Sequence, residues 1–206
     1  MAPSPDSRGP GTSLDNAVVA ELRANCLMFL DSWNSIRQPA IAFGNEPFTG
    51  TTDDRRLRFI YSMWGAVYSL VEAACRLSRI LWGTQGCKEL RARFGVPVES
   101  PIRDAHRVRD ILEHTEARIP EFVRSNPGKT LAGWRVESNP VKQAFPDVLT
   151  LRYLNLTTWE LRAYDPLGDW ECNLRSTAKA VQDLNLVLPE TLGYGLRVQG
   201  DEHSSV

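Results

Sequence analysis

The stretch LRFIYSMWGAVYSLVEAACRLSRIL, residues 57–81, decides the fold class of this chain. Its apolar side chains recur every three or four residues, which is the period of an α-helix with one buried face. Thr52 is a suitable N-cap before it, and Gly83 follows it. The sequence therefore predicts one helix of about eight turns. Its core face is predicted to hold Leu57, Ile60, Tyr61, Trp64, Val67, Val71, Ala74, Cys75 and Leu81.

Three further helices are predicted outside this stretch and the region around residue 110. One begins at Ser13 and ends before Pro39, because proline disrupts a helix interior, and residues 39–51 are expected to form a loop. A short helix spans about residues 87–94. The last begins after Asn173, a residue type that caps helix starts. Its predicted core face consists of Leu174, Ala178, Val181 and Leu184.

Two segments before the last helix have the composition of strands. Residues 148–154 and 159–164 are rich in β-branched and aromatic side chains, and a turn is predicted at residues 165–168. Amphipathic helices joined by short connections bury their apolar faces by packing together. The predicted fold class is therefore mostly α: an up-and-down helical bundle of four or five helices with a small accessory β-hairpin before the last helix.

The chain is expected to form a single domain. Residues 1–12 contain mainly Pro, Gly and Ser, which favours a disordered tail, and residues 193–206 are a polar tail. Residues 13–192 of the 206 then form one helical-bundle domain. The start of the chain lacks the apolar core of a secretion signal.

Composition excludes several classes of function. The net charge of −1 argues against a nucleic-acid coat protein or a membrane-surface protein. No apolar run of about 18 residues is present, so no membrane span is predicted. The four cysteines form no Cys-x-x-Cys pair, and we expect reduced, structural thiols and a cytoplasmic location.

The chemically suggestive segment is PIRDAHRVRDILEHTEARI, residues 101–119, predicted as one helix with Ser100 as N-cap and Pro101 as its first residue. One face is apolar over an arc of roughly 120°. This core face holds Ala105, Val108, Ile111, Leu112 and Ile119. The opposite face is polar and charged. It carries Arg103, His106, Arg109, Asp110, Glu113 and His114.

The string from Arg109 to His114 has the form Arg-x4-His, with Asp110 after the arginine and Glu113 before the histidine. In this it resembles the HEPN superfamily. The resemblance implies a bundle of four or five helices that usually forms a homodimer in which two such motifs face one another. It also implies a metal-independent endoribonuclease of a toxin–antitoxin, abortive-infection or other bacterial defence system, although other members have lost activity. Glu116 stands where one toxin subgroup has tyrosine.

The roles that follow from the resemblance need no metal and no cofactor. His114 would act as acid or base in cleavage of RNA, because imidazole titrates near neutral pH. Arg109 would stabilise the negative charge on the phosphorane oxygens. Asp110 and Glu113 would orient His114 and hold Arg109.

Two other residues of this face, His106 and Arg103, are predicted to have supporting or surface roles. The main alternative for the whole face is a catalytically silent protein of the same fold. Its polar helix face would then be buried against a second copy, an antitoxin or another partner protein. A solvated face with ion pairs between helical neighbours is a further alternative. An open cleft around Arg109 and His114 would favour the enzyme, and a closed ion-pair network would favour the silent protein.

Overall fold

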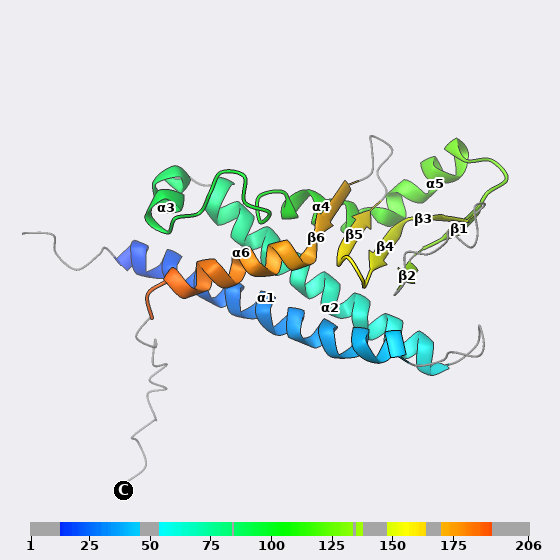
Figure 1. Cartoon of the computed structure of the whole chain (residues 1–206). Coiled ribbons are helices and arrows are strands. Elements are labelled where there is room, and N and C mark those ends of the chain that lie inside the picture. The colour runs from blue at the N-terminus through cyan, green and yellow to red at the C-terminus, as the bar shows by residue number, and fades with distance from the viewer. Residues whose placement is uncertain are drawn as a thin grey trace, which may run out of the picture.

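The computed structural model is built around two long helices, α1 (Ser13–Asn45) and α2 (Asp54–Ser78), which lie against each other (Figure 1). The structure describes residues 13–45, 54–83, 85–133, 135–137, 148–163 and 170–190. The predicted tails at residues 1–12 and 193–206, the cap at Thr52 and the turn at residues 165–168 lie outside these ranges.

Helix α1 is longer than predicted, because Pro39 lies inside it instead of ending it. A proline inside a helix costs one backbone hydrogen bond and introduces a steric clash with the preceding turn. Ile36 and Ala40 are both buried on either side of the proline. Their packing continues the apolar face through this point, which explains why the helix persists to Asn45. The loop predicted at residues 39–51 is therefore wrong for residues 39–45.

Helix α2 confirms the strongest helical prediction, and a π-helical segment η1 (Arg79–Gly83) extends it. Leu81 is fully buried within η1. The predicted core face is correct except at Leu57 and Tyr61, which are exposed, Tyr61 by 61%. Tyr61 is one residue beyond the buried Ile60 and therefore about 100° around the helix from it. That rotation places its side chain outside the buried arc.

The helix predicted at residues 101–119 is wrong in its bounds. Residues 101–104 form turns, the helix α4 covers Ala105–Glu113, and a separate helix α5 covers Thr115–Ser125 with Pro120 inside it. His114 is the junction residue between the two helices. The predicted core residues Ala105, Val108, Ile111 and Leu112 are all buried. The apolar face was thus predicted correctly within α4, but Ile119 lies in α5 and is only half-buried, and the break between the two helices was not predicted.

The short helix α3 (Cys87–Arg93) agrees with the prediction, and so does the β-hairpin made by β4 (Arg152–Asn155) and β5 (Glu160–Ala163). The hairpin belongs to a larger sheet than predicted. β6 (Trp170–Asn173) pairs antiparallel with β5, and β2 (Arg135–Glu137) pairs parallel with β4. A two-stranded parallel sheet is formed by β1 (Thr130–Ala132) and β3 (Val148–Thr150).

The β4–β5 turn fixes the sheet to the helices. Trp159 has a positive φ of 59°, which is rare for a bulky residue, and its side chain is only 8% exposed. Its ring packs edge-on against Trp33 of α1, with 4.6 Å between ring centroids. The side-chain oxygen of Asn155 accepts hydrogen bonds from the backbone N–H groups of Thr157 and Thr158. Trp159 therefore packs the hairpin onto the bundle.

Helix α6 (Leu174–Val187) packs on α1 and begins at the predicted cap (Figure 1). The side-chain oxygen of Asn173 accepts a 2.9 Å hydrogen bond from the backbone N–H of Ser176. Its amide nitrogen donates to the backbone carbonyl of Thr158, at 3.0 Å. Asn173 therefore ties the start of α6 to the β4–β5 turn. All four residues predicted for the core face of α6 are buried.

Replacing Asn173 by alanine is expected to lower the free energy of unfolding by about 1 kcal/mol, because the cap and the bond to Thr158 are lost together. Urea denaturation measures the change. Asn173→Asp is the matched control, since it keeps the acceptor oxygen and loses only the donor. If both variants lose the same free energy of unfolding, the hydrogen bond from Ser176 to the Asn173 oxygen does not stabilise the start of α6.

One continuous apolar core runs through α1, α2, α4, the β4–β5–β6 strands and α6. All four cysteines are free thiols, and Cys26 and Cys75 are fully buried in this core. Burial raises the pKa of the Cys26 thiol to about 12, so this side chain packs as a small apolar group. Across the described ranges, no helix is both long and apolar enough to cross a bilayer.

Candidate functional site: an ion-pair network in a hollow between two helices

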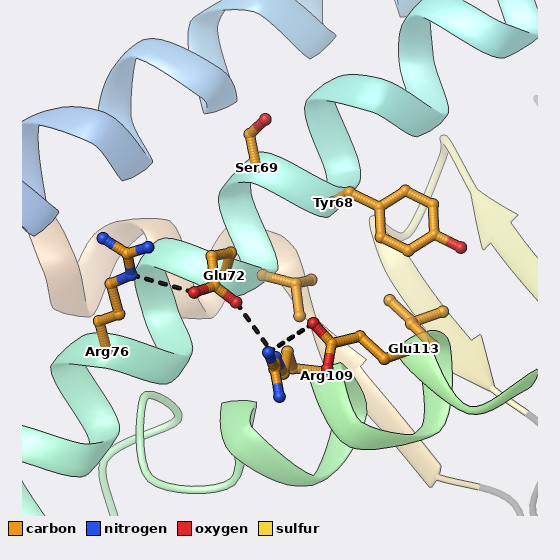
Figure 2. Close-up of a pocket in the computed structure, with 8 residues that line it drawn as sticks. Tyr68, Ser69, Glu72, Arg76, Arg109 and Glu113 are labelled. Carbon is orange, nitrogen blue, oxygen red and sulfur yellow. Dashed lines mark hydrogen bonds and ion pairs between the residues drawn. The ribbon is translucent and has the colours of Figure 1, made fainter.

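Helix α4 packs on the second half of α2, and a hollow of about 400 Å³ opens between them (Figure 2). The two helices run in opposite directions, because His106 lies near Ser78 whereas Leu112 and Glu113 share the hollow with Tyr68 and Ser69. The floor of the hollow is apolar and its rim is charged. It is lined by Tyr68, Ser69, Val71, Glu72, Arg76, Arg109, Leu112 and Glu113.

Arg109, the predicted catalytic arginine, points into this hollow but is bound by three carboxylates. Its Nε donates to Oε2 of Glu72 at 3.1 Å, and one terminal nitrogen lies 2.5 Å from Oε1 of Glu113 (Figure 2). The other terminal nitrogen lies 3.4 Å from Oδ1 of Asp110. The Arg109 side chain is 24% exposed. The predicted contacts of Asp110 and Glu113 with Arg109 are therefore present, and Glu72 adds a third that crosses between helices.

The network changes the acidity of its members. Desolvation alone would lower the pKa of Arg109, but Glu72, Glu113 and Asp110 together outweigh it and raise the pKa above its ordinary value. Burial also disfavours the charged form of Glu72, and alone it would raise the pKa of this carboxyl group. Hydrogen bonds from Arg76 and Arg109 outweigh that effect and hold the Glu72 pKa below its ordinary value of 4.5. Both shifts favour the charged forms, so the ion pairs persist at neutral pH.

The lowered pKa of Glu72 predicts a loss of stability in acid. A carboxylate with a depressed pKa in the folded state contributes stability that is present above pH 4.5, its pKa when unperturbed. That contribution is lost as the pH falls below 4.5 and through the folded pKa. Glu72→Gln should therefore show a smaller drop in unfolding free energy than wild type between about pH 5 and about pH 3. Glu99→Gln, which removes an exposed carboxylate, is the control, and an unchanged pH profile in Glu72→Gln would contradict the assignment.

Glu72 and Arg76 are site residues that the sequence analysis missed. Oε1 of Glu72 accepts a 3.0 Å bond from Nε of Arg76, so one carboxylate bridges Arg76 and Arg109. Their spacing of four residues was a usable signal, because a glutamate four residues before an arginine forms a helical ion pair. Glu72 and Arg76 lie beside core residues of the helix predicted at residues 57–81, and the sequence analysis considered only the apolar face of that helix. Nothing local in the sequence indicates that α4 would place Arg109 against them.

His114, the predicted catalytic histidine, is not among the residues that line the hollow. It is exposed at the junction of α4 and α5, and its backbone N–H donates to the carbonyl of Asp110 at 3.2 Å. The sequence places Asp110 and His114 four residues apart on one predicted helix. In the structure α4 ends at Glu113, so the helix is not continuous at His114, although the bond from its N–H to Asp110 keeps the spacing of one helical turn. The structure brings Arg109, Asp110 and Glu113 together and leaves His114 beside them at the helix end.

His106 and Arg103 lie toward the other end of α4, away from the lining of the hollow. Nδ1 of His106 is 3.0 Å from the backbone carbonyl of Arg103, so the tautomer protonated at Nδ1 donates there. The buried hydroxyl of Ser78 donates to the same carbonyl at 2.6 Å. The Arg103 side chain forms an exposed ion pair with Glu99 at 3.5 Å. These contacts attach the start of α4 to the end of α2.

The fold and the network define a helical-bundle protein with a charged hollow on its α2–α4 face. Within the part of the chain that the structure describes, no group of three or more His, Cys, Asp or Glu side chains is placed to hold a metal ion. Comparisons with protein families, with curated proteins and with solved structures find no match for this chain.

Proposed function

We propose that this protein is a catalytically silent, helical-bundle interaction protein whose α2–α4 face binds a partner. The observation that carries the proposal is the closed network around Arg109, in which each of the three guanidinium nitrogens contacts a carboxylate. An arginine that stabilises a phosphorane needs free donors directed at the reacting phosphate. Binding a phosphate here would require breaking ion pairs whose carboxylates repel it.

The position of His114 supports the same proposal. Acid–base catalysis requires the imidazole within hydrogen-bond reach of the reacting atoms, or one water away. His114 follows the end of α4 and does not line the hollow that holds Arg109. Within the described part of the chain, Arg109 lines this hollow and His114 does not, which supports a site without catalysis.

The proposed partner is a second copy of this chain. The α2–α4 face carries acidic Asp110 and Glu113 at the end of α4 and basic Arg76 near the end of α2, and the exposed Arg79 follows at the start of η1. Because the two helices run in opposite directions, the acidic and basic ends are separated along the face. A two-fold axis between them would set the acidic end of one copy against the basic end of the other. The four free thiols are consistent with a cytoplasmic protein.

Sedimentation of wild type and Glu113→Arg tests this interface. We expect wild type to dimerise, and the charge reversal to weaken dimerisation at least about tenfold, because like charges then meet. The double variant Glu113→Arg/Arg79→Glu should recover part of the loss. Glu171→Arg, a charge reversal on the exposed face of the sheet, is the control. A wild-type monomer, or equal effects of Glu113→Arg and Glu171→Arg, would contradict the proposed interface.

An endoribonuclease of a bacterial defence or toxin-type system is the second candidate. One observation favours it: Arg109 lines an open hollow, and the exposed His114 directly follows Glu113, which lines the same hollow. For this candidate a dimer would have to complete the site, and an antitoxin would be the natural partner protein. Metal-free cleavage of RNA by wild type, lost in His114→Ala, would establish it in place of the silent protein.

A further inference from the structure

The carboxylate of Glu72 is held in an unusual way for a helical ion pair. It joins two arginines from different helices, with Oε1 bound to Nε of Arg76 and Oε2 bound to Nε of Arg109, at 3.0 and 3.1 Å (Figure 2). Both arginines therefore direct donors at one point on the rim of the hollow. Guanidinium groups bind carboxylate and phosphate oxygens with the same fork geometry. Glu72 thus occupies the place of an external oxyanion.

We propose that Arg76 and Arg109 form a phosphate-binding fork that the Glu72 carboxylate keeps closed. The hollow beside it is large enough for a phosphate group, and the Glu72 side chain is 33% exposed, which leaves it a path out of the fork. A phosphate has more oxygens than a carboxylate. The additional oxygens reach the terminal nitrogens of Arg76, whose bond to Glu72 uses only Nε and whose side chain is 48% exposed.

The surrounding charges determine how the fork behaves. With Glu72 in place, the five charged groups Glu72, Arg76, Arg109, Asp110 and Glu113 sum to −1, which repels an anion. Without the Glu72 charge they sum to zero, and two guanidinium groups face the hollow. Glu72 is therefore an autoinhibitory contact. This inference rests on the proposed function and deepens it, because the Glu72 carboxylate would explain why the site binds no substrate phosphate. It also names phosphate as the group that competes with a partner protein for Arg76.

Titration of wild type, Glu72→Ala and Glu72→Gln with inorganic phosphate at low ionic strength tests the fork. We expect phosphate to bind both variants at least about tenfold more tightly than wild type, since a charge-assisted hydrogen bond is freed on each arginine. Glu72→Ala/Arg76→Gln should return to the wild-type affinity. Glu160→Ala is the matched control, because Glu160 also pairs with an arginine, Arg162, on the sheet surface, and no second arginine among the described residues bonds to it.

The outcomes separate this inference from the proposed function. Folding of each variant is checked by circular dichroism, and Glu72→Gln keeps the side-chain shape if Glu72→Ala does not fold. No gain in either variant, or a gain that persists after Arg76→Gln, would overturn the fork and leave the interaction protein untouched. Tighter binding of malonate than of phosphate would assign the fork to carboxylates and overturn the phosphate assignment. Dimer loss in the sedimentation experiment bears only on the interface.

Discussion

Replacing Trp159 by alanine is expected to lower the free energy of unfolding by about 3–4 kcal/mol, as for other buried aromatic residues. The ring is almost completely buried and makes an edge-on contact with Trp33. Such an aromatic pair adds about 0.5–1.5 kcal/mol to the free energy of burial. The ring is also the contact by which the β4–β5 turn packs on α1, so its loss weakens the docking of the whole sheet.

The backbone conformation of Trp159 predicts different stabilities for two variants that both lose the ring. Its φ of 59° lies in the left-handed region, which costs any L-residue with a side chain about 1–2 kcal/mol and costs glycine nothing. Trp159→Gly should therefore be more stable than Trp159→Ala, although both lose the ring. Urea denaturation compares the two, with the exposed Leu186→Ala as a control that should change little. If the alanine variant is at least as stable as the glycine variant, the positive φ at residue 159 is not kept in the variants, and the prediction is wrong.

Val108→Asp is expected to lower the free energy of unfolding by more than about 4 kcal/mol, or to prevent folding. Val108 is fully buried on the face of α4 that packs on α2, and it also borders a small void with Leu70 and Val71. An ionised carboxylate there has no partner to offset the loss of its hydration.

The same valine-to-aspartate change at the exposed Val98 is the matched control, and it should alter stability only slightly. Chemical denaturation of both variants measures the difference. Comparable stability of the two would mean that α4 does not pack on α2 through its apolar face. The hollow and the ion pairs of Arg109 would then lose their structural basis.

The extent of sequence-based prediction follows from the range of the interactions involved. The apolar faces of α2, α4 and α6 and the cap at Asn173 are local patterns, and the structure confirms them except at Leu57 and Tyr61 of α2, which are exposed. Pro39 was misread because the packing of Ile36 and Ala40 compensates for the proline. β2 was missed because three residues paired with a distant strand leave little local pattern.

The site was predicted in part for the same reason. Asp110 and Glu113 are helical neighbours of Arg109, and their contacts with it were foreseen. Glu72 is distant in sequence and approaches Arg109 only when α4 packs on α2. The end of α4 at Glu113, which leaves His114 at the junction of two helices, depends on how α5 is placed. Each of these facts is a property of tertiary packing.

Metal-free incubation of a mixed RNA pool with wild type and with His114→Ala, at matched folding and oligomeric state, tests the central claim most directly. The claim is that the ion pairs of Arg109 join α4 to α2 and that this site does not catalyse RNA cleavage. It predicts the same background of intact RNA with both proteins. Cleavage by wild type that leaves 2′,3′-cyclic phosphate ends, and that disappears in His114→Ala, would contradict it and establish an endoribonuclease.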